Sequence, residues 1–330
     1  MLDVAKESGT SLKTVSRVVN GEAGVNPDLV VKVERAVKKL HYRHNLTAGS
    51  LRRLGGKTKT IGLLLENVSN PFSAALHRSV EDSARSRGID VLTGSLDGDS
   101  QRERELINGF VARRVDGLIV VPSSDDHKYL TTERRAGTHF VFIDRPALNF
   151  NSDTVTATNS AGVEEAVTSL VGLGHTRIAY LGDAEKIFTA KERHNGYRKA
   201  LRAAKIPVDK DLEKLGFIDE SEIESFLIGL LSRQNRPTAI FTGQNIITLV
   251  AIRVLRSKNL HHNIALIGFD DLPLADLLDP AIALVTQDIH VMGSIAAQLL
   301  FDRIDGAKTP FEERVVPTTF AQRASGLIKP

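Results

Sequence analysis

The spacing of apolar residues divides the chain near residue 60. Beyond Thr60, short apolar runs alternate with longer segments of helical spacing, and the alternation restarts after Asn159. Short buried strands separated by helices indicate parallel sheets with right-handed crossovers, and the restart predicts two lobes. The predicted strands span 61–65, 89–93, 117–121, 140–143, 178–181, 215–218, 239–242, 264–267 and 282–285. The predicted helices span 71–87, 101–114, 128–136, 161–173, 192–204, 222–233, 246–258 and 292–303.

The C-terminal part is expected to cross between these lobes. Thr286 and Gln287 directly follow a predicted strand and mark one crossing. Helix 292–303 and the strand-like segment 313–320 then return the chain to the first lobe and afterwards to the second. Lobe one is therefore assigned to about 59–157 and 287–318, and lobe two to about 158–286 and 319–330.

Before residue 60 the apolar spacing is helical. One short segment reaches a tight turn at 8–10, a second follows with Ser11 as its expected N-cap, and a third begins at Asn26-Pro27. The apolar positions of the first two are Leu2, Val4, Ala5, Leu12, Val15, Val18 and Val19. Those of the third are Leu29, Val33, Ala36, Val37 and Leu40. Two short helices joined by a tight turn and closed by a third predict a helix-turn-helix unit.

A helix-turn-helix presents the polar side chains of its second helix to base edges in the major groove of DNA. Lys13 and Arg17 are the strongest candidates for base edges, and Leu12 for an apolar base contact. Asn26 is a candidate for a phosphate contact, although capping explains it equally well. The candidate DNA-contacting residues of this unit are Ser11, Leu12, Lys13, Thr14, Ser16, Arg17, Asn20 and Asn26.

The charge distribution separates the same two parts. Residues 1–57 contain eleven Lys and Arg against five Asp and Glu, whereas the whole chain has a net charge of only +3. A basic head on a slightly acidic body is typical of a DNA-binding unit attached to another domain. A solvated basic face is the alternative on charge alone, and the helix-turn-helix spacing argues against it.

Residues 45–54 carry a helical pattern of about ten residues, fewer than the ~12–15 that an isolated helix needs to persist in water. We expect this segment to be disordered until a partner folds it, and a plain linker is the alternative. Gly56-Lys57-Thr58 resembles the end of a P-loop. The glycine that should open that motif is Leu51 here, which argues against nucleotide hydrolysis.

Polar side chains follow most of the predicted strands. In open α/β sheets, ligands bind beyond the carboxyl ends of the strands, so these side chains are expected around one cleft. Each could instead cap the helix that follows it. The residues at these positions are Asn67, Ser69, Asn70, Ser123, Ser124, Asp144, Arg145, Asp183, Gln244, Asn245, Asp270 and Asp271.

Composition argues against several classes of protein. The absence of Cys excludes disulfides and thiolate metal sites, and no apolar run approaches the ~18 residues of a membrane span. With no signal-peptide core at the N-terminus, a soluble cytoplasmic protein is expected. No G-x-G-x-x-G follows a strand and no H-E-x-x-H or Ser/His/Asp set stands out, so we expect no catalytic residue, metal or cofactor. An enzyme with a Rossmann-like core is the alternative.

Several motifs occur in one order: D-V-A at 3–5, T-V-S-R-V at 14–18, S-N-P-F at 69–72, I-D-R-P at 143–146 and G-F-D-D at 268–271. Together they resemble the lactose-repressor/galactose-repressor (LacI/GalR) family of bacterial transcription regulators. The resemblance implies a small all-α helix-turn-helix head plus an α/β two-lobed periplasmic-binding-protein-like effector domain. It implies boundaries of 1–44 for the head, 45–58 for a hinge helix and linker, and 59–330 for effector binding and dimerisation. A Thr caps the first helix in relatives, and Met1-Leu2 leave that cap missing here.

The resemblance also assigns roles to single residues of the head and hinge. The family's hinge helix orders on operator DNA, pairs with its mate from a second subunit and inserts a Leu into the minor groove. The matching pattern in this chain is Asn45, Ala48 and Leu51.

In the cleft, the resemblance makes Arg193 the cleft arginine, with a surface ion pair on helix 192–204 as the alternative. Asp270 would accept hydrogen bonds from the ligand. Gln244-Asn245 stands where the family usually has Asn-Asp, which removes a carboxylate. The candidate effector-binding residues are Asn70, Phe72, Ser73, Ser123, Asp144, Arg145, Arg193, Gln244, Asn245 and Asp270.

The function that the resemblance implies is sequence-specific transcriptional regulation by a repressor that binds a pseudopalindromic operator as a homodimer. A small polar metabolite in the cleft would control it allosterically. A sugar is the family's commonest effector, with polyols and nucleosides as alternatives. The sequence shows no apolar heptad tail, so a dimer is expected rather than a coiled-coil tetramer. A sugar-binding module without a DNA role is the alternative function.

Overall fold

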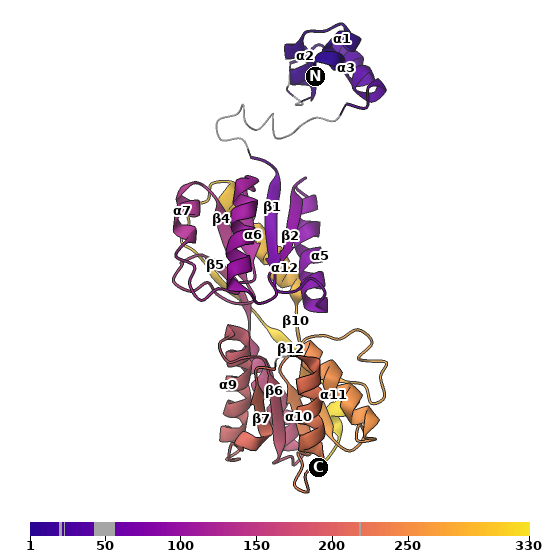
Figure 1. Cartoon of the computed structure of the whole chain (residues 1–330), viewed down its shortest axis with the longest axis vertical. Helices are drawn as coiled ribbons and strands as arrows, with labels where there is room; N and C mark the ends of the chain where they lie inside the picture. Colours follow the sequence, from indigo (N-terminus) through magenta and orange to yellow (C-terminus); the bar gives the residue numbers. More distant parts are fainter. Residues whose placement is uncertain (20–21, 23, 43–56, 218) are drawn as a thin grey trace. The chain divides into compact units, whose positions relative to one another are not determined.

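The computed structural model describes residues 1–19, 22, 24–42, 57–217 and 219–330. These form two compact units, Met1–Thr58 and Lys59–Pro330 (Figure 1). Among the described residues, none of the helices has the length and apolar character that crossing a membrane would need.

The first unit contains the helices α1 (Leu2–Ser8), α2 (Leu12–Val19) and α3 (Pro27–Lys39). They pack around a core of Val4, Val15, Val33 and Ala36. Gly9 ends α1 in the left-handed conformation, with φ 63°, which glycine adopts without strain. The Ser11 hydroxyl accepts the backbone N–H of Thr14 at 3.1 Å, so Ser11 caps α2 as predicted.

The ends of α1 and α3 test three further expectations. α1 starts after Met1 without a side-chain cap, as expected. Asn26 caps α3, because its side-chain oxygen accepts the N–H of Asp28 at 2.9 Å. The prediction for Leu40 was wrong, since its side chain is 39% exposed rather than part of the apolar stripe. Leu40 follows the last helical residue, where the chain turns away at His41.

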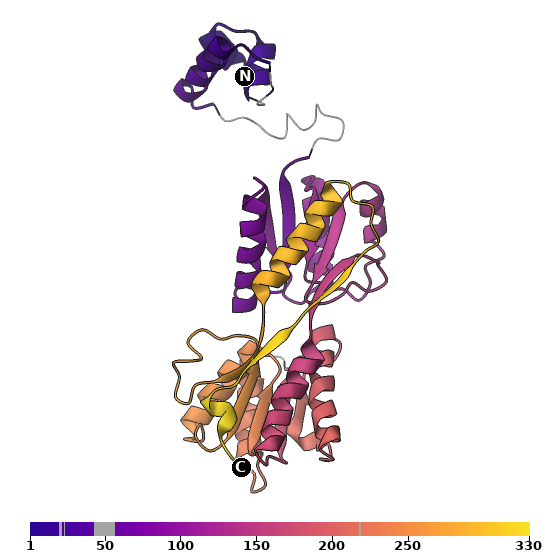
Figure 2. The ribbon, with the colours of Figure 1, turned by 180° about the vertical axis from the view of Figure 1, so that it is seen from behind.

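The second unit begins with a parallel sheet in the order β11-β5-β4-β3-β1-β2. Its strands are β1 (Thr60–Leu65), β2 (Asp90–Ser95), β3 (Gly117–Val120), β4 (His139–Ile143), β5 (Asp153–Ala157) and β11 (Glu313–Val316). Its helices are α5 (Pro71–Arg85), α6 (Ser100–Ala112), α7 (Leu130–Arg135) and α12 (Ile289–Ile304). Helices α5 and α12 cover one face, and α6 and α7 the other, as Figures 1 and 2 show from the two sides.

The other lobe is built around a second sheet, in the order β12-β10-β9-β8-β6-β7. Its strands are β6 (Ile178–Gly182), β7 (Glu213–Leu215), β8 (Ala239–Thr242), β9 (Ala265–Phe269), β10 (Ala283–Gln287) and β12 (Thr318–Ala321). Its α-helices are α8 (Asn159–Gly172), α9 (Phe188–Ala203), α10 (Glu220–Leu231) and α11 (Asn245–Ser257), with 3₁₀ turns at Lys210–Leu212 and Ala324–Leu327. Helices α8 and α9 pack on one face and α10 and α11 on the other. The prediction that the strands of each sheet run parallel is wrong for β12, which runs antiparallel to β10.

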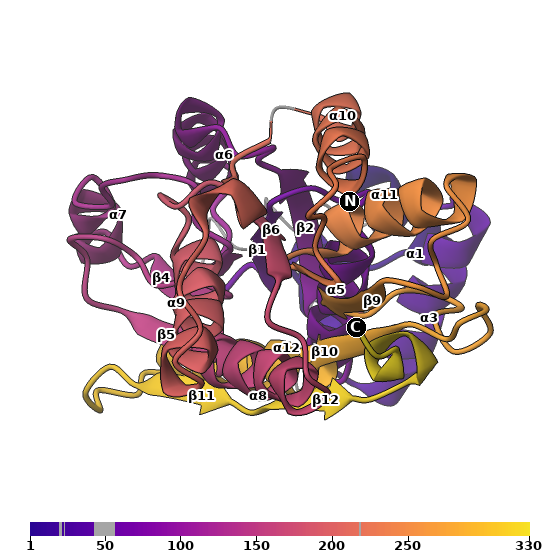
Figure 3. The ribbon, with the colours of Figure 1, turned by 90° about the horizontal axis from the view of Figure 1, so that it is seen from below.

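The chain passes between the two sheets at Thr158, Asp288 and Pro317. The first and last passages are tied together, because the Thr318 N–H donates to the Thr158 hydroxyl at 2.8 Å. Gly162 makes this approach possible, since a Cβ there would lie 2.4 Å from the Thr318 hydroxyl. Figure 2 shows β11 and β12 as a continuous ribbon crossing between the lobes, and in Figure 3 both strands lie along one side of the unit.

Most predicted elements are confirmed to within a few residues at each end, and the exceptions are polar or short. Strand β5 was missed because Asp153–Ala157 alternates polar and apolar residues and contains no apolar run. Strand β7 lies at Glu213–Leu215 rather than 215–218, and position 218 is outside the described residues. Helix α9 begins at Phe188, four residues before its predicted start. The crossing expected at Thr286-Gln287 comes one residue later, because both residues pair with β12.

A buried ion pair fastens α12 to the edge of the first sheet. Arg303 donates to both carboxylate oxygens of Asp153, through Nε at 2.7 Å and Nη2 at 2.8 Å. It also donates to the carbonyls of Thr309 and Pro310 at 2.6 and 2.9 Å. Asp153 is fully buried and accepts the N–H of Glu312 at 2.9 Å as well, which places β11 next to β5.

Replacing Arg303 with Ala should lower the free energy of unfolding by about 3–5 kcal/mol, because it leaves the Asp153 carboxylate buried without its partner. Urea denaturation of the full chain measures this. Arg78→Ala is the control, since Arg78 is 66% exposed and its ion pairs among the described residues are with Glu81 and Asp82 of its own helix. The control should change the free energy by about 1 kcal/mol or less. Equal effects of the two variants would contradict a structural role for the buried pair.

Candidate functional site

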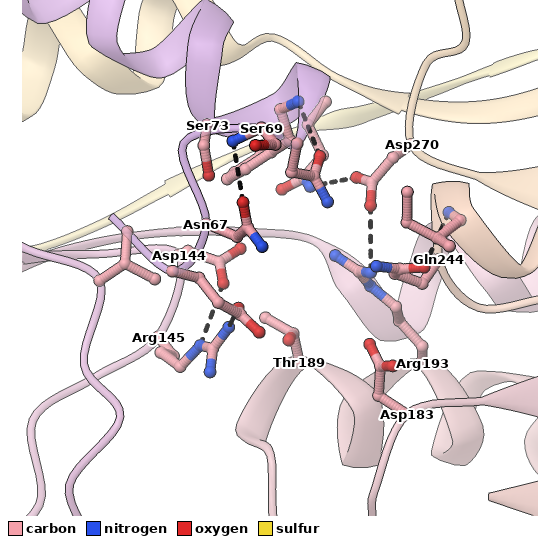
Figure 4. Close-up of a pocket in the computed structure, with 16 residues that line it drawn as sticks. Asn67, Ser69, Ser73, Asp144, Arg145, Asp183, Thr189, Arg193, Gln244 and Asp270 are labelled. Atoms are coloured by element: carbon pink, nitrogen blue, oxygen red, sulfur yellow. Dashed lines mark hydrogen bonds and ion pairs between the residues drawn. The ribbon is translucent and has the colours of Figure 1, made fainter. Parts of the chain in front are cut away.

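A polar cavity of about 250 Å³ lies between the carboxyl ends of the strands of the two lobes (Figure 4). Its volume lies just below the ~300–1,000 Å³ of typical sites for drug-sized ligands, so it suits a small molecule. Both sheets contribute their strand-end loops, as the sequence predicts for open α/β sheets. The lining residues are Glu66, Asn67, Ser69, Asn70, Phe72, Ser73, Val121, Asp144, Arg145, Asp183, Thr189, Arg193, Gln244, Ile246, Asp270 and Gln287.

Two aspartates occupy equivalent positions in the two lobes. The sheets share one strand pattern, in which β4 corresponds to β9, and Asp144 and Asp270 directly follow these strands. Both have a left-handed backbone, with φ 71° and 70°, which Asp tolerates better than most residues. Their N–H groups donate to Val155 and Val285 of the neighbouring strand, each at 2.9 Å. The same local structure therefore directs one carboxylate from each lobe toward the cavity.

Each of these aspartates has an arginine partner. In the first lobe, Arg145 pairs with Asp144 at 3.2 Å and with Glu66. In the second lobe, the Arg193 guanidinium lies 3.4 Å from the Asp270 carboxylate and 3.8 Å from the centre of the Phe269 ring. Burial raises the pKa of Asp270, and the charge of Arg193 opposes that rise.

Arg193 lies in the cavity, as the resemblance implied, and is not part of a surface ion pair. Its Nε donates to Asn159 at 2.8 Å and its Nη1 donates to the carbonyl of Gly243 at 2.9 Å. The guanidinium is thereby fixed in one orientation before any ligand arrives. A fixed planar guanidinium can donate to two oxygen atoms of a ligand with little loss of side-chain entropy.

In the described part of the chain, Asp183 is the lining carboxylate that forms no ion pair with an arginine. It directly follows β6 and points into the cavity near Arg193 (Figure 4). Burial raises its pKa to about 6, the Glu66 carboxylate adds to the rise, and Arg193 and Arg145 oppose it. At neutral pH this group is therefore charged at a free-energy cost.

A reciprocal pair of amides joins the two lobes beside the cavity. The Asn245 side-chain NH₂ donates to the Asn70 oxygen at 2.8 Å, and the Asn70 NH₂ donates back at 3.2 Å. The Asn70 oxygen also accepts the N–H of Phe72 and so caps α5. Asn245 is buried against this partner and does not line the cavity, contrary to its predicted effector contact.

Ser123 also lies outside the cavity lining, although it was predicted to bind the effector. Its N–H and that of Ser124 donate to the buried Glu103 carboxylate at 2.5 and 3.1 Å. Burial raises the pKa of Glu103, whereas contact with His127 and the N–H of Ser123 lower it by more. Ser123 therefore belongs to the hydrogen-bond network that holds the loop after β3.

The other predicted effector residues line the cavity, but the predicted set was incomplete. Glu66 could have been found from its position directly after β1. Thr189 gave no signal, because the start of α9 was predicted too late to place it near the cleft. Gln287 lies at the end of β10 and donates to Asp270 at 2.7 Å, a contact between side chains that no local pattern encodes. The lining residues absent from the predicted effector set are Glu66, Asn67, Ser69, Val121, Asp183, Thr189, Ile246 and Gln287.

The candidate DNA-contacting residues of α2 lie on a small, well-capped helix. Leu12 is 43% exposed, and Lys13 is exposed beside it. Arg17 pairs with Glu22 at 3.3 Å, and both side chains remain partly exposed. The Ser11 hydroxyl is already used in the N-cap. The predicted contacts Asn20, Asn45, Ala48 and Leu51 lie outside the described residues.

Comparison with known proteins places this architecture in a family. Residues 1–45 match the bacterial regulatory proteins of the lacI family, and residues 167–326 match a periplasmic binding protein-like domain. The ribose operon repressor of Escherichia coli (strain K12) is 31% identical over 92% of this chain and 92% of its own. The chain belongs to the lacI family.

Two further relatives span the length of this lacI-family chain. Catabolite control protein A of Priestia megaterium is 30% identical and covers 90% of each chain. A solved complex of the transcriptional regulator CelR with cellobiose is 30% identical, with a TM-score of 0.72 over 98% of each chain. The predicted family and fold class are confirmed.

Replacing Asn245 with Ala should loosen the contact between the lobes, because it removes both amide hydrogen bonds and leaves Asn70 with an unpaired NH₂. The chain has no Cys, so one Cys at Arg78 and one at Arg253, which are 66% and 65% exposed, can carry spin labels on the two lobes. The distance distribution between the labels should broaden toward longer distances. The free energy of unfolding should fall by about 1–3 kcal/mol.

Asn235→Ala is the matched control, since Asn235 is an exposed asparagine of the same lobe. It should leave both measurements unchanged. An Asn245→Ala distance distribution that superimposes on that of the unmodified sequence would show that the amide pair does not hold the lobes together.

Proposed function

We propose that this chain is a DNA-binding transcriptional repressor controlled by a small polar metabolite. The observation that carries the proposal is the combination, in one chain, of a helix-turn-helix and a two-lobed cavity lined by hydrogen-bonding side chains. One relative is named for the ribose operon and another was solved with cellobiose. Both names refer to a sugar, so a sugar is the proposed effector, ahead of a polyol or a nucleoside.

For the DNA contacts, two copies would read a pseudopalindromic operator as a homodimer, with α2 of each in the major groove. Lys13 and Arg17 would contact base edges and Leu12 an apolar base group. The Arg17–Glu22 pair is partly exposed, so it contributes about 1 kcal/mol or less and DNA can replace it. The remaining proposed contacts of this helix and its surroundings are Ser11, Thr14, Ser16, Asn20 and Asn26.

The link between effector and DNA is the proposed hinge at 45–58, between a head at 1–44 and an effector domain at 59–330. Asn45, Ala48 and Leu51 would face the minor groove there. The effector need only prefer one relative pose of the two lobes to change operator affinity, and couplings of this kind are typically about 1–3 kcal/mol. The relatives are transcriptional regulators, so we propose binding without turnover, in the cytoplasm where the protein meets DNA.

Arg17→Ala should relax sequence specificity, because a bidentate base contact discriminates by about 1–3 kcal/mol. The measurement is the affinity of the full chain for DNA selected by it from a random pool, for single-base variants of that DNA, and for unrelated DNA. Arg35→Ala is the charge-matched control on α3 and should weaken binding to all sequences alike. A uniform loss with Arg17→Ala would make it a phosphate contact, and the absence of any DNA binding would favour a sugar-binding module.

Arg193→Ala should abolish the effector's stabilisation of the fold. In a panel of sugars, polyols and nucleosides, a ligand at 100 times its dissociation constant adds about 2.7 kcal/mol to the free energy of unfolding. Thermal unfolding of each variant is compared with its own ligand-free value. Arg202→Ala, an exposed arginine of the same helix, should keep the full response. Retention of the response by Arg193→Ala would place the ligand elsewhere.

A further inference from the structure

The cavity contains more carboxylates than cations. Its ionisable lining residues are Glu66, Asp144, Asp183, Asp270, Arg145 and Arg193, which gives a formal charge of −2. The arginines are engaged by Glu66, Asp144 and Asp270. Among the described residues, Asp183 makes no hydrogen bond or ion pair, although its side chain is largely enclosed. A ligand entering this site meets a net negative field and one carboxylate, Asp183, whose charge Arg193 and Arg145 compensate only in part.

The two lobes contribute symmetrically to this excess of negative charge. β1 and β6 occupy corresponding positions in the two sheets, and Glu66 and Asp183 directly follow them. The two carboxylates thus reach one cavity from opposite lobes, and their repulsion opposes the present arrangement of the lobes. A positive charge between them would offset that repulsion and would favour this arrangement.

The other lining residues indicate which chemical groups the ligand carries besides its positive charge. Asn67, Ser69, Ser73, Thr189 and Gln244 offer amide and hydroxyl groups that suit ligand hydroxyls. Phe72, Val121 and Ile246 supply a small apolar surface for the carbon face of a ring. The cavity volume of about 250 Å³ suits one ring rather than a chain of rings.

We propose that the effector is a one-ring hydroxylated amine, of the class of free amino sugars, whose ammonium group sits between Glu66 and Asp183. This inference rests on the proposed ligand-binding function of the cleft and specifies its ligand. Asp183 determines specificity, because it distinguishes a protonated amine from the neutral hydroxyl at the same ring position. Phosphorylated and carboxylated sugars are disfavoured by the same negative field.

The first test uses matched probes with the full chain. Glucosamine, galactosamine and mannosamine are each compared with the parent hexose, the N-acetyl form and the 6-phosphate by calorimetric titration. At least one amine should bind roughly tenfold or more tightly than its three counterparts, which corresponds to about 1.4 kcal/mol. Asp183→Asn should remove that advantage, and the control Asp211→Asn, an exposed aspartate of the same lobe, should retain it.

The second test needs no ligand. In the folded chain, ionisation of Asp183 costs free energy, because its pKa is raised to about 6. The charged groups that line the cavity with it are Glu66, Asp144, Asp270, Arg145 and Arg193. A group with a raised folded pKa destabilises the fold above that pKa, and the cost disappears as the pH falls through it. Asp183→Asn should therefore raise the urea midpoint at about pH 7, and this gain should shrink toward about pH 5.

The outcomes separate the two proposals. The amine inference is overturned if a neutral or phosphorylated sugar binds best, or if no amine in the panel binds. The DNA-binding proposal is then judged by its own assay. An Asp183→Asn variant that is less stable than the unmodified chain at about pH 7 would show that the carboxylate is compensated, and would also overturn the inference. If the unmodified chain shows no sequence-specific DNA binding, the proposed repressor function is overturned instead.

Discussion

The three passages of the chain between its two sheets constrain the whole second unit. They lie at Thr158, Asp288 and Pro317, and the hydrogen bond from Thr318 to Thr158 ties the first to the last. Because of them, both sheets direct their carboxyl ends toward one cavity, and the lobes can change their relative pose only by bending these short connections. A ligand that prefers one pose therefore acts on a small number of backbone positions.

The correspondence between the lobes explains the electrostatics of the cavity. Equivalent strands place Asp144 opposite Asp270 and Glu66 opposite Asp183, so carboxylates accumulate in pairs. Arg145 and Arg193 compensate half of this formal charge. They do so from different elements, the loop after β4 and the helix α9, and neither neutralises Asp183 fully. The site is thus prepared for hydrogen-bond donors and positive charge, and it is poorly suited to anions.

The polar contacts within the second unit differ in how readily a ligand could change them. The Asp153–Arg303 pair is buried within one lobe and holds α12 and β11 in place whatever occupies the cavity. The Asn70–Asn245 pair spans the lobes and involves only neutral amides, whose net contribution is about 1 kcal/mol per hydrogen bond. A ligand with a modest preference for one pose is sufficient to compete with a contact of that size.

The sequence by itself determined the family, the order of most elements and the ends of many helices. Caps such as Ser11 and Asn26 are local, and long apolar stripes and buried strands have periods that can be read along the chain. Only the tertiary structure decided the polar strand β5, the position of β7, the antiparallel β12, and the pairing of Asn70 with Asn245. These depend on neighbours far along the chain, and no local period or propensity encodes which distant side chain a polar group will meet.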